Sequence, residues 1–221
     1  MAEIKGLVRA LRSGDDAAKT AAARTLCNLA FQDYNRDLIR YAGGVPPLVE
    51  LVRDGSAEAK FEAAWALSIL ARNNAANKVA IAAAGGIAPL VELLRDGSAE
   101  AKRQAARALG NLAADNAANR VLIAEAGGIP PLVQLVRDGS ADARMCMRNL
   151  ARNNVANAVA IAAAVGFEAL VQLARFGRVT VDNWLIVSDA GVPAKRKAAL
   201  VVAALPDSVP RENKDIIASY L

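Results

Sequence analysis

The stretch GGVPPLVELVRDGSAEAKFEAAWALSILARNNAANKVAIAAA (residues 43–84) is followed directly by GGIAPLVELLRDGSAEAKRQAARALGNLAADNAANRVLIAEA (residues 85–126). The two segments are near-copies, and the second begins where the first ends. The same step relates the glycine pairs at 43–44, 85–86 and 127–128, the prolines at 47, 89 and 131, and the Asp-Gly pairs at 54–55, 96–97 and 138–139. A period of about 42 residues is typical of helical solenoids, in which each repeat is one supersecondary unit.

Turn-forming and capping residues divide each unit into three helices. A short helix over Asn77–Ala84 ends at the glycine pair 85–86, because glycine tolerates the left-handed conformation that terminates helices. Pro89 marks the start of a medium-length second helix, where a missing N–H costs nothing. Ser98 is a suitable N-cap for a long third helix over Ala99–Ala113.

This order of short, medium and long helices, with a glycine pair after the first, resembles the armadillo repeat. The matching stretches are NRVLIAEAGGIPPLVQLVRDGS (residues 119–140) and AAWALSILA (residues 63–71). A HEAT repeat has two helices and lacks the glycine pair. The resemblance implies an all-α, right-handed α-solenoid (superhelix) of about four three-helix repeats plus a divergent C-terminal cap. Its repeats would occupy residues 1–177, as approximately 1–42, 43–84, 85–126 and 127–164 plus the following helix, with a divergent insert and capping helices over 178–221.

The repeats at the two ends are irregular. The chain opens at a second helix, over Ile4–Leu11. The fourth long helix, ADARMCMRNLA (residues 141–151), is four residues shorter than its counterparts. Four residues is close to one helical turn, so we expect the helix to shorten and keep its facing. The core is expected to consist of leucines on the long helices, namely Leu26, Leu29, Leu67, Leu70, Leu109, Leu112 and Leu150.

Composition narrows the function classes. The chain contains no histidine, which excludes Ser-His-Asp and Cys-His catalysis and most zinc sites. Cys27 and Cys146 lie three repeats apart, about 30 Å for stacked helices, which is too far for a disulfide. We therefore expect reduced thiols in a cytoplasmic or nuclear protein. With no leader pattern, membrane span, metal motif or phosphate loop, we predict a non-enzymatic protein with no cofactor, no metal and no membrane association.

The resemblance also implies a binding face. In armadillo proteins the long third helices line a concave groove, and asparagines on them hydrogen-bond the backbone of an extended peptide. The matching positions are Asn28, Ile69, Asn111 and Asn149. Four residues earlier, where nuclear-import receptors of this family often carry tryptophan, the chain has Arg24, Trp65, Arg107 and Met145. Continuing along the same face adds Phe31, Arg72, Ala114 and Arg152.

The net charge of +5 and the four groove arginines, opposed by Glu62 and Asp142, favour an acidic partner. We therefore predict a scaffold that binds proteins or extended peptides, with acidic or phosphorylated segments as ligands. The asparagines could instead hold the helical layers in register, Trp65 could belong to the core, and the arginines could form a solvated face. The alternative functions are a self-associating module, whose groove is filled by the apolar segment near Trp184 or by a second copy, and, more weakly, a nucleic-acid-binding surface.

Overall fold

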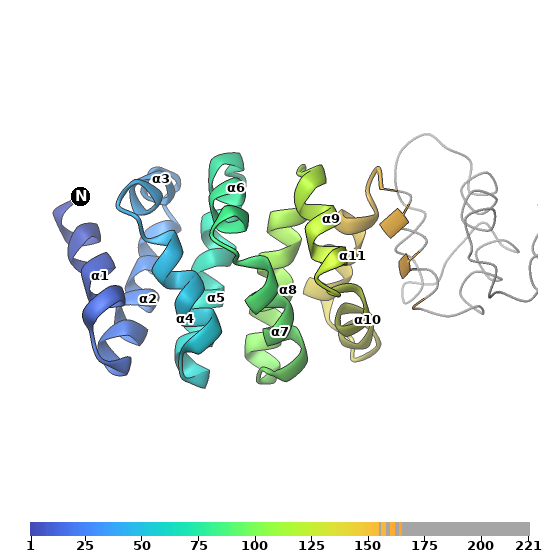
Figure 1. The fold of residues 1–221 in the computed structure, drawn as a ribbon, viewed down its shortest axis with the longest axis horizontal. Coiled ribbons are helices and arrows are strands. Elements are labelled where there is room, and N and C mark those ends of the chain that lie inside the picture. Colours follow the sequence, from blue (N-terminus) through green and yellow to red (C-terminus); the bar gives the residue numbers. More distant parts are fainter. Residues whose placement is uncertain (155, 158–159, 162–163, 165–221) are drawn as a thin grey trace, which may run out of the picture.

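The computed structural model describes residues 1–154, 156–157, 160–161 and 164. Within them eleven α-helices follow one another without a strand (Figure 1). They are α1 (Ala2–Ser13), α2 (Asp16–Ala30), α3 (Asp33–Tyr41), α4 (Val45–Asp54), α5 (Ala57–Ala71), α6 (Ala75–Ala83), α7 (Ile87–Asp96), α8 (Ala99–Ala113), α9 (Ala117–Glu125), α10 (Ile129–Arg137) and α11 (Ala141–Ala151). The predicted all-α solenoid is confirmed. The predicted insert and capping helices, Trp184 included, lie outside the described residues.

The helices form three parallel stacks. First helices (α3, α6, α9) lie along one edge, second helices (α1, α4, α7, α10) lie towards the viewer, and third helices (α2, α5, α8, α11) lie behind them (Figure 1). The most extensive packing between repeats joins each third helix to the next one, from α2 to α11. Each repeat thus contacts mainly its neighbours, as in other solenoids.

Local chemistry sets the helix boundaries. The Ser98 hydroxyl accepts a hydrogen bond from the Ala101 N–H at 3.2 Å, and α8 spans the predicted residues. Gly85 has a φ of +74°, as its helix-terminating role requires. Its neighbour Gly86 lies so close to Ile81 that an added Cβ would sit 2.8 Å from the isoleucine Cγ2. The helix α6 begins at Ala75, two residues earlier than predicted, because the preceding Asn74 side chain caps it.

The predicted leucine core is largely confirmed. Six of the seven leucines are fully buried, and Leu29 is only partly buried. Leu29 belongs to α2, which has no third helix before it, so one flank of α2 faces solvent. The shortened α11 has 11 residues against 15 in α8, and its Cys146, Met147 and Leu150 remain buried.

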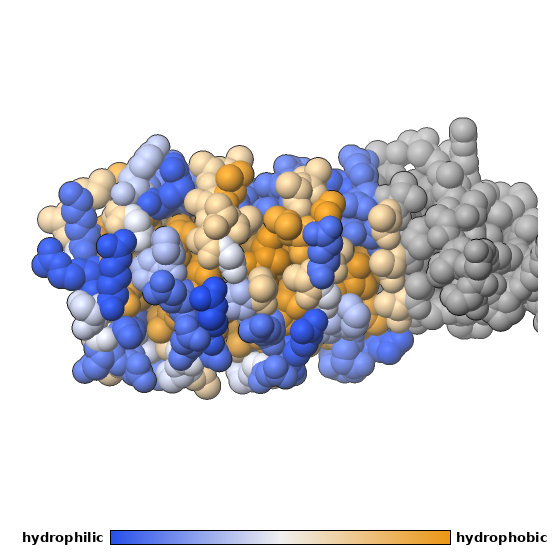
Figure 2. Space-filling view, in the orientation of Figure 1, coloured by the Kyte–Doolittle hydropathy of each residue, from blue (hydrophilic) through white to orange (hydrophobic). Residues whose placement is uncertain are grey.

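The face opposite the third helices has a mixed surface. In Figure 2 hydrophilic side chains cover α1 and the lower edge, while apolar surface lies over α6 and α9. The exposed apolar residues there include Val79, Val121 and Leu122. Within the described part, no single helix is long and apolar enough to cross a bilayer; α6 and α7 reach that length only together, with an 80° bend between them.

Candidate functional site

The predicted site residues lie on the exposed side of the third helices α2, α5, α8 and α11, which we call the ladder face. Asn111 donates its Nδ2–H to the Ser68 carbonyl at 2.8 Å, and Asn149 donates to the Gly110 carbonyl at 2.9 Å. Both acceptors belong to the third helix of the preceding repeat. Asn28 has no such helix before it, and its side chain is exposed. Ile69, at the remaining position, is buried.

The shortened α11 preserves this register. Asn111 and Ser68 are 43 residues apart, whereas Asn149 and Gly110 are 39 apart. The difference of four residues equals the deletion, so the asparagine still reaches the equivalent carbonyl. Removing about one turn keeps the same helix face towards the neighbour. The structure therefore confirms that α11 shortens without changing its facing.

Trp65 lies at a half-buried position beside the core. The Phe31 ring meets Trp65 edge-on with centroids 6.4 Å apart, and Phe61 lies against Trp65 at 5.9 Å. The guanidinium of Arg72 sits over the Phe31 ring, 5.7 Å from its centroid. Trp65 thus belongs both to the edge of the core and to an aromatic cluster on the ladder face. Phe61 was not among the residues predicted for this face, although its i,i+4 spacing from Trp65 places both rings on one side of α5.

Two of the predicted arginines hold carboxylates of the next repeat. Arg24 contacts Glu62 through Nε and Glu58 through Nη2, both at 2.7 Å, and Arg107 contacts Asp142 at 3.1 Å. Hydrogen bonding to Glu62, and then to Glu58, raises the pKa of Arg24. The positive balance expected of this face is therefore reduced by internal pairing. The sequence did not reveal this pairing, because the partners belong to different repeats.

The remaining two arginines lie at the C-terminal ends of third helices. Arg152 pairs with Asp115 at 3.5 Å. Arg72 forms no ion pair within the described residues, where its side chain stacks on Phe31 instead. Arg72 is therefore the predicted groove cation with a guanidinium least engaged by acidic groups of the chain itself.

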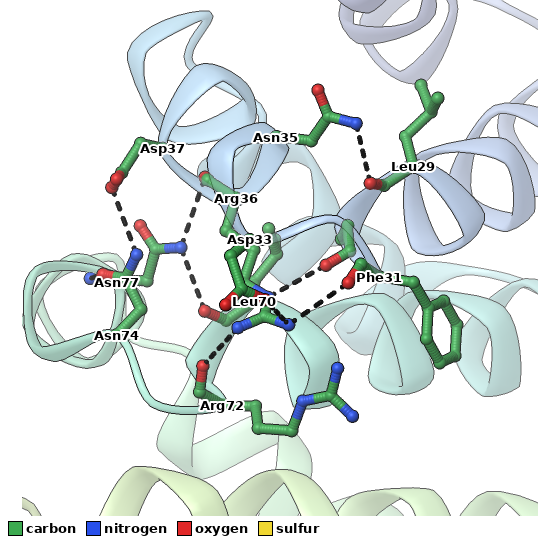
Figure 3. Close-up of polar contacts among 11 residues, drawn as sticks. Leu29, Phe31, Asp33, Asn35, Arg36, Asp37, Leu70, Arg72, Asn74 and Asn77 are labelled. Atoms are coloured by element: carbon green, nitrogen blue, oxygen red, sulfur yellow. Dashed lines mark hydrogen bonds and ion pairs between the residues drawn. The ribbon is translucent and has the colours of Figure 1, made fainter.

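A second set of polar residues is buried between the repeats and joins them (Figure 3). Asn77 donates to the carbonyls of Leu70 and Arg36, at 2.9 and 3.2 Å. Asn119 and Asn157 repeat this arrangement one and two units later. Each asparagine therefore satisfies a carbonyl at the C-terminus of its own repeat's third helix, which has no partner within that helix. The matching of Asn35, Asn77 and Asn119 along the sequence was visible, but their acceptors were not.

Buried cations alternate with these asparagines along the array. Arg36 donates to the Ala30 and Arg72 carbonyls, both at 2.9 Å, and Figure 3 shows its guanidinium lying between the two repeats. Arg120 donates in the same way to Ala113 and Arg152, at 3.0 and 2.8 Å. Lys78, at the equivalent position of the second repeat, donates to the Ala114 carbonyl alone. The single ammonium group of lysine lacks the forked donors with which the arginine guanidinium binds two carbonyls at once.

Replacing Lys78 with arginine is expected to stabilise the protein by about 1 kcal/mol at neutral pH, since the guanidinium adds a bond to the Ala71 carbonyl. Burial lowers the pKa of Lys78 from its ordinary value of 10.5. Between the lowered pKa and 10.5 the unfolded chain binds more protons than the folded one, so the stability of the parent rises with pH through that window. The advantage of the arginine variant should therefore shrink from about pH 7 to about pH 10. Urea denaturation of both proteins at the two pH values measures this, and an advantage that grew with pH would contradict it.

Both cysteines are buried and free. Burial raises the pKa of Cys27 to about 12, and it raises that of Cys146 further. A thiol that stays protonated is a poor nucleophile and a poor metal ligand. Within the part of the chain that the structure describes, no three His, Cys, Asp or Glu residues group as they would around a metal ion.

Two pockets lie away from the ladder face, beside the turns that join second to third helices. One is lined by residues such as Lys60, Pro89 and Ser98, and the other by Lys102, Pro131 and Ser140. None of the predicted site residues lines either pocket.

This arrangement of repeats and side chains is matched by known proteins. The family model described as Armadillo/beta-catenin-like repeat matches residues 32–72 and 74–114. The chain belongs to the armadillo repeat family. The two matched ranges are offset by the same step as the glycine pairs. Each range begins at a first helix rather than at a glycine pair, so the family model describes the same repeat from another starting point.

Several solved structures share this armadillo fold. An engineered protein is 30% identical with a TM-score of 0.72, and the match covers 100% of this chain and 85% of the other. A designed armadillo repeat protein in complex with the peptide (KR)4 is 27% identical with a TM-score of 0.70, over 98% of this chain and 87% of the other. A structure reported in a study of the interaction between cadherin and beta-catenin is 18% identical with a TM-score of 0.68. The match covers 95% of this chain and 38% of the other, and it supports the fold alone. No curated protein matches the chain significantly.

Proposed function

We propose that this armadillo repeat protein is a non-enzymatic scaffold that binds extended acidic or phosphorylated segments of proteins along its ladder face. The observation that carries the proposal is the equivalent placement of Asn111 and Asn149 on successive third helices. The reduced cysteines fit a place in the cytosol or nucleus, as proposed from the sequence.

The asparagines keep most of their hydrogen-bonding capacity. A carboxamide offers two N–H donors and one carbonyl oxygen. Asn111 and Asn149 each use one N–H on the preceding repeat, and both side chains remain partly exposed. The second N–H and the Oδ1 of each suit one backbone C=O and one N–H of an extended peptide. The inter-repeat bond fixes the rotamer, so little side-chain entropy is lost on binding. Register-keeping and peptide binding are therefore compatible roles for the same side chain.

The arginines of the ladder face favour an acidic ligand, because the ligand's acidic groups can replace the carboxylates that now pair with them. Glu58 and Asp142 pair with arginines in partly exposed positions, where ion pairs are weak. A carboxylate or phosphate of the partner would take the place of these carboxylates on Arg24 and Arg107. Arg72 offers its planar fork without displacing an internal carboxylate. The face therefore combines backbone binding by asparagine with anion binding by arginine.

The test is a titration of the full chain with four eight-residue labelled peptides that differ in charge, because roughly eight extended residues span four rungs. They are an acidic, a phosphoserine-containing, a neutral and a (KR)4 peptide, and affinity is measured by fluorescence anisotropy. We expect the acidic and phosphorylated peptides to bind more tightly than the other two. Asn111→Ala and Arg72→Glu should each weaken them about tenfold, the effect of one good or one charged hydrogen bond.

Arg9→Glu on α1, outside the ladder face, makes the same charge change and should leave binding within about twofold. Preferential binding of (KR)4 would overturn the acidic specificity. Absence of binding together with a mass that rises with concentration would favour the self-associating module instead. Binding to mixed-sequence oligonucleotides with a steep salt dependence, and to none of the peptides, would favour the nucleic-acid surface.

A further inference from the structure

The aromatic side chains of the ladder face gather at the border of the first two repeats. Phe31 from α2 and Phe61 and Trp65 from α5 form one cluster, with both phenylalanine rings against the tryptophan. At the positions equivalent to Phe61 and Trp65, the third repeat carries Arg103 and Arg107. The ladder face is therefore aromatic at the border of the first two repeats and carries arginines at the equivalent positions of the third repeat.

The cluster remains open to solvent. The Phe31 residue is 45% exposed, and Trp65 and Phe61 are only partly buried. Phe31 is the C-cap residue of α2 and lies at the end of that helix. Exposed aromatic rings that meet at an edge are a common anchor of protein interfaces, because they bury large area at a small cost in side-chain entropy.

A cation adjoins the cluster. The Arg72 guanidinium lies 5.7 Å from the Phe31 centroid, and it forms no ion pair among the described residues. A lysine or arginine of a ligand placed on Phe31 would be repelled by this charge. A carboxylate would be attracted, and the aromatic face would orient the planar guanidinium for a bidentate contact.

We propose that the Phe31–Phe61–Trp65 cluster and Arg72 form the anchor subsite of the peptide ligand, taking a large apolar or aromatic residue together with an acidic residue two positions away. The proposal rests on the function proposed above and adds which residues the ligand must contain. In an extended segment, residues i and i+2 point to the same side and lie about 7 Å apart. This spacing is comparable to the 5.7 Å between the Arg72 guanidinium carbon and the Phe31 centroid.

The experiment compares two acidic eight-residue peptides that differ at one residue. The anchor peptide carries phenylalanine two positions before an aspartate, and the reference peptide carries alanine there. The parent chain should bind the anchor peptide about tenfold more tightly, the effect of partly burying one aromatic side chain. In a Trp184→Phe background, which leaves Trp65 as the single tryptophan of the two in the chain, the anchor peptide should change the tryptophan emission more than the reference peptide does.

Phe31→Ala should abolish the preference between the two peptides. Tyr34→Ala removes an aromatic residue that is 68% exposed on α3 and has no place in the cluster, and it should preserve the preference. Equal binding of both acidic peptides, unaffected by Phe31→Ala, would overturn the anchor subsite and leave the proposed function intact. Tighter binding when the aspartate is replaced by lysine would also overturn it. If neither acidic peptide binds, the proposed function fails, and the anchor subsite falls with it.

Discussion

Replacing Asn77 with alanine should lower the free energy of unfolding by about 2–3 kcal/mol. The side chain is fully buried, and its carboxamide donates to the Leu70 and Arg36 carbonyls. The Leu70 carbonyl lies in the last turn of the third helix α5, and the Arg36 carbonyl belongs to the preceding repeat. Alanine would leave a helix-terminal carbonyl buried without a donor and would remove a link between repeats. The Asn77 Oδ1 accepts no hydrogen bond within the described structure, so its removal offsets part of the loss and keeps the expected value below that of a core truncation.

Urea denaturation followed by circular dichroism measures this change. The matched control is Asn28→Ala, which makes the same substitution at an exposed helical position and should change stability by no more than about 0.5 kcal/mol. An Asn77→Ala variant as stable as the control would show that the buried asparagines do not hold the repeats together. Asn119→Ala should repeat the result one unit later, because its two acceptors occupy equivalent positions.

Replacing Leu109 with alanine should destabilise the protein by about 3–4 kcal/mol, and its effect should be uneven along the array. Leu109 is completely buried in α8, which packs against α5 on one side and α11 on the other. Truncation removes buried apolar area and leaves a cavity at the centre of the described repeats. Because each repeat contacts mainly its neighbours, the loss divides the array instead of weakening every part equally.

Denaturation and amide hydrogen exchange together test this result. Protection should fall most in α5, α8 and α11, and least in α1 and α2, which do not contact α8 extensively. Leu122→Ala is the control in the same repeat: this leucine is 44% exposed on α9, and its truncation should cost about 0.5 kcal/mol or less. A uniform loss of protection from α1 to α11 would indicate a single cooperative unit and contradict the local effect.

Much of the fold follows from short-range features of the chain. The constant repeat step, the glycine pairs and the serine caps predicted three helices per repeat, and α8 spans the predicted Ala99–Ala113. These features work because a helix end is decided by a few neighbouring residues, such as a serine that accepts one N–H or a glycine that adopts positive φ. The helix α6 begins two residues before the predicted start, because the Asn74 side chain caps it there.

The candidate site was only partly predictable. The sequence placed Asn111, Asn149, Trp65 and the arginines on one face, since residues three and four apart share a helix side. It did not indicate that Arg24 would hold Glu58 and Glu62, or that Arg107 would hold Asp142, and it therefore overstated the positive charge available to a ligand. It also left out Phe61, whose contact with Trp65 completes the aromatic cluster.

The sequence by itself determined the repeat, the number and order of the helices and the helix side on which most side chains lie, because these depend on spacing within a single helix and on caps within a few residues. Only the tertiary structure decided which groups meet across repeats: the carbonyls bound by Asn111 and Asn149, the buried bonds of Asn77 and Arg36, and the carboxylates paired with the ladder-face arginines. These partners belong to successive repeats, and whether they touch depends on how closely successive third helices pack. Small residues such as Gly110 set that distance, since an added Cβ there would lie 3.2 Å from the Cys146 Cα.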